Sequence, residues 1–199
     1  SVIVCAILVV VLVTFLQRDN TQGPVANGNT TTDSSGLQGT DLGSTPAPDF
    51  HLTDQFGKTV SLSQFQGQPV VLTFMYTHCP DECPLTAEKL HSVMQKLGSD
   101  SQHVAVLAVS VDPSRDTTDA AISFSKAHNM LDYWHFLIGT QQTLVPIWSS
   151  YNVFAQTAQT TVNHTLPVYL IDKQGRERVY LDNDFTVTQL TEDLKILLK

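Results

Sequence analysis

Apolar runs separated by polar turns recur over the last three quarters of the chain and predict strands. Residues 69–76 (PVVLTFMY) and 103–111 (HVAVLAVSV) are almost continuously apolar, which is typical of strands buried on both faces of a sheet. A third apolar run, 167–171, is followed by a tight turn around Gly175. The predicted strands cover residues 48–52, 69–76, 103–111, 135–138, 167–171 and 177–181.

Helical spacing appears between these runs. After Pro84, which suits the first turn of a helix, the apolar residues follow the i, i+3, i+4, i+7 pattern until Gly98, so a helix is expected over 84–97. Thr117 is a suitable N-cap for a second helix that ends near Asn129. A third helix is expected over 141–151. Apolar residues share one face of the first helix: Leu90, Val93, Met94 and Leu97. A last helix is expected near the end of the sequence, with these apolar residues on one face: Val187, Leu190, Leu194 and Leu197.

The resulting order, β-α-β-α-β-β-α with a cysteine pair after the first core strand, is that of thioredoxin. We therefore predict an α/β, thioredoxin-like fold in which a central mixed sheet is flanked by helices on both faces. An N-terminal strand extension precedes this core. The folded domain is expected to cover residues 46–199.

The first part of the chain has a different character. Residues 1–16 carry no charge and are nearly long enough to cross a bilayer, so a membrane anchor is predicted over 1–17, its start trimmed. A cleaved signal peptide and a lipoprotein cysteine at Cys5 are the alternatives. Residues 18–45 are rich in Asn, Thr, Gly and Ser, and such a segment is expected to form a flexible linker.

Composition narrows the classes of partner. The chain has 42% hydrophobic and 15% charged residues and a net charge of −8, and this acidity argues against a nucleic-acid partner. Its three cysteines include one close pair, Cys79 and Cys83, which is not the pattern of a disulfide-rich scaffold.

The cysteine pair is the strongest chemical signal. Cys79 lies in the predicted loop and Cys83 at the mouth of the helix, where the helix N-terminus stabilises a thiolate. Thiolates serve disulfide exchange, soft-metal binding or both. Two buried free cysteines or a purely structural disulfide would be the plainer interpretations. Their neighbours Pro80, Asp81 and Glu82 favour a loop rather than an apolar core.

The spacing of the pair favours a metal. Three residues separate the cysteines, whereas thioredoxin-type redox motifs have two. A tetrahedral zinc site needs four ligands, while two sulfurs and one imidazole suit copper. His164 is the best third ligand, because its predicted loop, 159–166, precedes the core strand that crosses beside the cysteines in thioredoxin folds. His78 adjoins Cys79 but should point away. The remaining histidines are expected at the surface or satisfied in the core: His51, His91, His103, His128 and His135.

Three stretches, FMYTHCPDECPLT (74–86), VSVDPSRDT (109–117) and NHTLPVYLIDKQG (163–175), resemble the signature stretches of the Sco/SenC family of copper chaperones, in the family's order. The resemblance implies that Cys79, Cys83 and His164 bind a copper ion. It also implies a role in cytochrome c oxidase assembly, with the subunit that bears the dinuclear copper centre as partner. Leu166–Pro167 departs from the family pattern, and the isomer of this bond is left open.

Other residues near the motifs have two interpretations each. Asp81 and Glu82 either attract a cation or partner, or form a solvated loop. Asp112, Arg115 and Asp116 either shape the rim of the site or cap the next helix. Phe74 and Tyr76 are expected in the core.

The predicted function is therefore a copper metallochaperone. A thiol-disulfide reductase that maintains its client's copper-ligand cysteines is the alternative, so enzymatic activity is left open. A thiol peroxidase is disfavoured because Thr77 lies only two residues before Cys79. A copper or redox sensor is a further alternative. Other periplasmic copper chaperones and thioredoxin-like reductants are candidate partners. We expect the domain in the bacterial periplasm, tethered to the membrane, with the mitochondrial intermembrane space as the alternative.

Overall fold

The computed structural model describes residues 36–157 and 162–199. Their core is a six-stranded sheet in the order β1-β10-β9-β4-β5-β6, where β4 and β5 are parallel and β4 and β9 antiparallel. The sheet is therefore mixed, as predicted. Its strands are β1 (Thr40–Pro46), β4 (Val70–Met75), β5 (Ala105–Ser110), β6 (His135–Leu137), β9 (Val168–Ile171) and β10 (Arg176–Leu181).

The central strands are the continuous apolar runs of the sequence. Every residue of β4, β5 and β9 is buried, because helices cover both faces of the sheet. Two short hairpins complete the strands: β2 (His51–Thr53) with β3 (Thr59–Ser61), and β7 (Ala155–Thr157) with β8 (Val162–His164).

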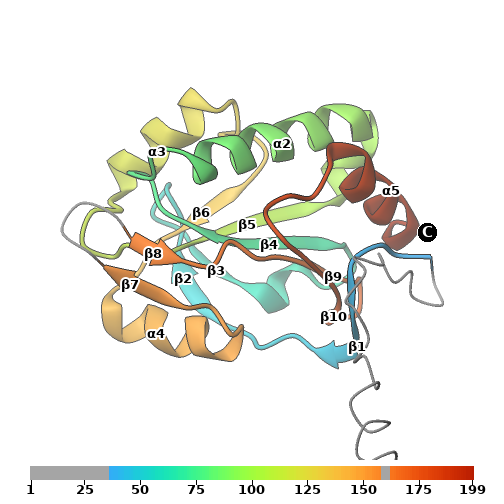
Figure 1. Ribbon diagram of the computed structural model, residues 1–199, viewed down its shortest axis with the longest axis horizontal. Coiled ribbons are helices and arrows are strands. Elements are labelled where there is room, and N and C mark those ends of the chain that lie inside the picture. The colour runs from blue at the N-terminus through green and yellow to red at the C-terminus, as the bar shows by residue number, and fades with distance from the viewer. Residues whose placement is uncertain (1–35, 158–161) are drawn as a thin grey trace, which may run out of the picture.

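Helices α2 (Glu82–Leu97), α3 (Thr118–Ala127) and α5 (Val187–Leu197) lie along one face of the sheet, and α4 (Gln141–Ser150) lies on the other (Figure 1). Two short 3-10 helices, Leu62–Phe65 and Gly98–His103, precede β4 and β5. The chain passes from β4 through α2 to β5 and through α3 to β6 in the same direction along the sheet. Right-handed crossovers therefore place α2 and α3 on the same face.

The prediction of a flexible linker over residues 18–45 is wrong for its last residues. Residues Thr40–Pro46 form strand β1, which pairs with β10. Leu37 is buried, and the backbone N–H of Gln38 donates to Asp193 Oδ1 at 2.9 Å. The polar composition conceals this strand, since it is held by backbone pairing rather than by an apolar face. The predicted anchor, 1–17, lies outside the described residues. Across 36–157 and 162–199, no helix combines the length and the apolar character that a membrane span needs.

Two other boundaries differ from expectation. Helix α2 begins at Glu82, so that Pro84 occupies its third position, where a backbone N–H would have no partner within the helix. The predicted loop around His164 is a strand in its described part, β8. The Leu166–Pro167 peptide bond is trans.

Candidate metal centre

The cysteine pair lies where β4 meets α2. Cys79 is half-buried in the connecting loop, and Cys83 is fully buried in the first turn of α2. The backbone N–H of Cys83 points at the Cys79 sulfur at 3.4 Å, as expected for donors at the start of a helix. Both thiols are free. The predicted placement of one sulfur in the loop and the other on the helix is confirmed.

His164 comes to the pair from a distant part of the chain. It ends β8, opposite Ala155 of β7, on the side of the molecule where α2 begins (Figure 1). Its Nε2 lies 4.0 Å from the Cys83 sulfur, and its Nδ1 lies 2.8 Å from the Thr165 carbonyl oxygen. Because a carbonyl only accepts, Nδ1 carries a hydrogen, so Nε2 is the ring nitrogen that can serve as a ligand.

The pKa values of the two cysteines are shifted in opposite directions. A hydrogen bond with the Cys83 thiol lowers the pKa of Cys79 to about 3, and burial opposes this shift. Burial raises the pKa of Cys83 far above its usual range, and the neighbouring Cys79 adds to that rise. The pair thus holds one proton, with Cys79 as the thiolate and Cys83 as the thiol.

A buried carboxylate anchors the cysteine loop. Asp116 Oδ1 accepts hydrogen bonds from the backbone N–H and the hydroxyl of Thr77, at 2.9 and 2.7 Å, and Oδ2 accepts from Ser110. Burial raises the pKa of Asp116. Since Ser110 ends β5 and Thr77 follows β4, Asp116 joins the carboxyl ends of the two parallel strands below the site.

Tyr76 is buried, as predicted, but it is also part of the site. Its ring lies edge-to-face with His164, with centroids 5.4 Å apart, and its hydroxyl accepts the backbone N–H of Val162 at 3.3 Å. The guanidinium of Arg115 lies 5.7 Å from the ring centroid and pairs with the buried Asp112. Sequence reasoning missed this role; the available signal was an aromatic residue three positions before Cys79.

The side chains of the other candidates are exposed or have partners outside the cysteine pair. Asp81 and Glu82 are exposed, and His78 is exposed with its Nδ1 2.9 Å from the Thr77 hydroxyl. His135 pairs with Asp54, and His128 faces Glu88. Phe74 is fully buried against Tyr151 and Tyr169, so it belongs to the core as predicted.

The donor set fits a soft metal ion. With metal–sulfur bonds of about 2.3 Å and metal–nitrogen bonds of about 2.0 Å, one ion can bridge a sulfur and a nitrogen 4.0 Å apart at an open angle. Within the described part of the chain, however, no three His, Cys, Asp or Glu side chains already stand together as a metal cluster.

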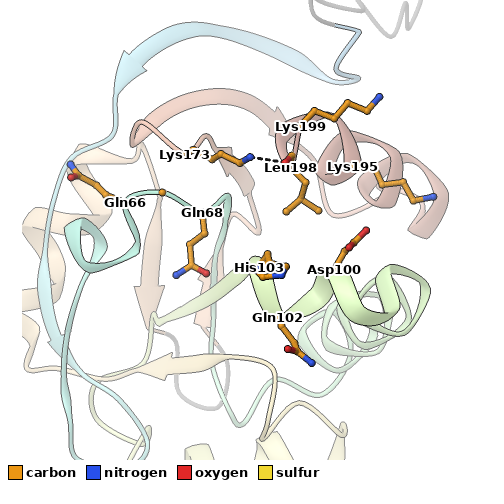
Figure 2. A pocket seen from close by; sticks show the side chains of 10 residues that line it. Gln66, Gln68, Asp100, Gln102, His103, Lys173, Lys195, Leu198 and Lys199 are labelled. Carbon is orange, nitrogen blue, oxygen red and sulfur yellow. Dashed lines mark hydrogen bonds between the residues drawn. The ribbon is translucent and has the colours of Figure 1, made fainter.

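A hollow of about 830 Å³ lies at the edge of the sheet opposite the cysteine pair (Figure 2). Gln68 precedes β4 and His103 precedes β5, so the hollow adjoins the amino ends of these strands, while the cysteines follow the carboxyl end of β4. Figure 2 shows Lys173 directed at the Leu198 carbonyl, to which its amine donates at 2.6 Å. This hollow is therefore separate from the cysteine site.

Comparison with known proteins adds relatives to this geometry. A model of the SCO1/SenC family matches residues 39–199. The mitochondrial SCO2 homolog of Bos taurus is 30% identical over 158 residues, which are 74% of this chain and 58% of the relative. The chain thus spans less than three fifths of the length of that curated relative.

Solved structures agree. The copper-bound structure of ScoI from Bradyrhizobium japonicum is 30% identical, covers 76% of this chain and 99% of its own, and superposes with a TM-score of 0.69. The apo Sco1 solution structure from Thermus thermophilus is 33% identical, covers 80% of this chain and 95% of its own, and superposes with a TM-score of 0.70. These similarities confirm the predicted thioredoxin-like fold and the family resemblance.

Proposed function

The chain belongs to the SCO1/SenC family, and we propose that it is a copper metallochaperone that holds one copper ion through Cys79, Cys83 and His164. It delivers this ion to the dinuclear copper centre of cytochrome c oxidase. The observation that carries the proposal is the imidazole of His164, whose free Nε2 lies 4.0 Å from the Cys83 sulfur across 81 residues of sequence.

The donor types support copper in particular. Two sulfurs and an imidazole suit a soft cation, and a relative that is 30% identical has been solved with copper bound. Because Cys79 is already a thiolate, only Cys83 must release a proton on binding. Three protein ligands leave the ion accessible to a thiolate of the receiving protein, so copper passes by ligand exchange.

The same pair suits the alternative function, thiol-disulfide exchange. Half-buried Cys79 is the attacking thiolate, and Cys83 beside it closes the intramolecular disulfide. This reductase would maintain the client's copper-ligand cysteines. It needs both sulfurs but not His164.

Localisation belongs to the same proposal. Residues 1–17 would anchor the domain in a membrane, with the folded part in the bacterial periplasm or, as the alternative, in the mitochondrial intermembrane space. The oxidase subunit that receives the copper would lie in the same membrane.

A transfer experiment tests the proposed function. The reduced, copper-loaded protein is mixed anaerobically with the copper-free soluble domain of that oxidase subunit, and copper in each is followed after separation. We expect transfer from wild type and little from His164→Ala, which is loaded poorly. If His164→Ala loads and transfers copper as wild type does, His164 is not a copper ligand. If wild type and His164→Ala transfer no copper and only reduce the acceptor's disulfide, the reductase function replaces the chaperone.

A further inference from the structure

Tyr76 contacts one proposed ligand, His164, and the backbone of another, Cys79. Its side chain is only 2% exposed and lies between the cysteine loop and strand β8. Its ring packs edge-to-face against His164 at a centroid distance of 5.4 Å. Its hydroxyl accepts the Val162 N–H at 3.3 Å, two residues before His164.

The same residue belongs to the segment that carries the cysteines. Tyr76 directly follows strand β4, and its carbonyl oxygen accepts the backbone N–H of Cys79 at 3.4 Å. Its backbone is therefore part of the cysteine loop, while its side chain contacts the strand that ends in His164.

We propose that Tyr76 is a positioning residue of the copper site, whose hydroxyl holds strand β8 through the Val162 N–H and whose ring orients His164. This inference rests on the proposed copper-binding function. The sulfur ligands and the imidazole come from segments that are about eighty residues apart in the sequence. Tyr76 lies in the first segment and contacts the second directly. A clamp of this kind limits how far His164 must move to complete the ligand set.

The ring of Tyr76 is itself held in place. Arg115 lies over it at 5.7 Å, and the guanidinium is fixed by its ion pair with Asp112, whose side chain is fully buried. The loop between β5 and α3 therefore supports the clamp from the side of the sheet.

Tyr76→Phe is the sharpest test, because it keeps the ring and removes only the hydroxyl. We expect the affinity for Cu(I), measured by competition with a chromophoric chelator, to fall about threefold to tenfold, the effect of one lost hydrogen bond. In copper-free protein, amide hydrogen exchange at Val162 should become faster by a similar factor, as followed by NMR.

Tyr133→Phe is the matched control. The Tyr133 hydroxyl accepts from Gln95 Nε2 at 2.8 Å, near the other end of α2, so this variant loses a comparable hydrogen bond away from the sulfurs. It should leave both readouts unchanged.

The outcomes separate the two proposals. Wild-type affinity together with wild-type exchange at Val162 in Tyr76→Phe would overturn the clamp and leave the chaperone function standing. Equal losses in Tyr76→Phe and Tyr133→Phe would also overturn it, since the effect would then be general. Wild-type protein that binds no copper would refute the proposed function, while exchange at Val162 would still decide whether the hydroxyl holds the hairpin.

Discussion

At the scale of single residues, the two cysteines of the site differ in how firmly they hold a proton. Cys79 is a thiolate because the Cys83 thiol donates to it, and Cys83 keeps its proton because it is buried. His164 keeps its hydrogen on Nδ1, which the Thr165 carbonyl binds. In the proposed copper site, one sulfur and one nitrogen would thus be ready for the ion, and the second sulfur would lose its proton when the ion binds.

This difference predicts a distinctive reactivity. Since the pKa of Cys79 is about 3, its thiolate fraction stays near one at every pH well above that value. Alkylation of Cys79 by iodoacetamide in the reduced, metal-free protein should therefore be nearly independent of pH between about 5 and 8. An unperturbed cysteine slows about tenfold per pH unit there. Peptide mapping by mass spectrometry gives the rate for each cysteine. Cys83 should remain unmodified, and a Cys79 rate that falls steeply below pH 8 would contradict the assignment.

Asp116 carries a second prediction at this scale. Asp116→Ala leaves the backbone N–H and hydroxyl of Thr77 and the hydroxyl of Ser110 without their acceptor. We expect the free energy of unfolding to fall by about 2–4 kcal/mol, measured by urea denaturation. Asp116→Asn retains one acceptor oxygen for Thr77 and should cost less. Equal stability of Asp116→Ala and wild type would show that these hydrogen bonds do not hold the cysteine loop.

At the scale of elements, continuous apolar runs were good predictors and polar segments were poor ones. The runs around Leu72, Leu107 and Leu170 are strands β4, β5 and β9, because burial on both faces requires such sequences. Strands β1 and β8 escaped detection, since their stability comes from backbone pairing with β10 and β7. The sequence placed Cys79 and Cys83 correctly, but it could not show Tyr76 beside His164, because that contact depends on how the hairpin folds back.

Strand β1 gives a prediction of its own. Gly39 has a φ of +120°, and a Cβ there would lie 2.6 Å from side-chain atoms of Leu181 and Val179 and 2.7 Å from the Tyr180 carbonyl oxygen. Gly39→Ala should therefore lower the free energy of unfolding by about 2–4 kcal/mol, from overpacking and backbone strain together.

Gly43→Ala is the matched control for that strand. Gly43 also has a positive φ, +75°, but nothing lies within 4 Å of its Cβ position, so only the backbone cost of about 1 kcal/mol applies. Urea denaturation measures both variants. A Gly39→Ala variant no less stable than Gly43→Ala would contradict the close packing of β1 on β10.

At the scale of the whole molecule, the fold brings two distant segments to one edge of the sheet. The carboxyl ends of β4 and β5 supply the cysteine loop and its Asp116 anchor, and the β7–β8 hairpin, inserted before β9, supplies His164. The hollow of Figure 2 adjoins the opposite edge and shares no residue with the site. The cysteine site and this hollow are therefore separate in this protein.

The most direct test of the central claim is a copper titration. The protein is reduced, kept anaerobic and titrated with Cu(I), and wild type is compared with His164→Ala and with His103→Ala, whose exposed imidazole lies at the far edge. We predict one copper per chain for wild type and His103→Ala, and an affinity at least about 100-fold lower for His164→Ala, more than the loss of a supporting group costs. Equal affinities in all three proteins would contradict the Cys79, Cys83 and His164 site.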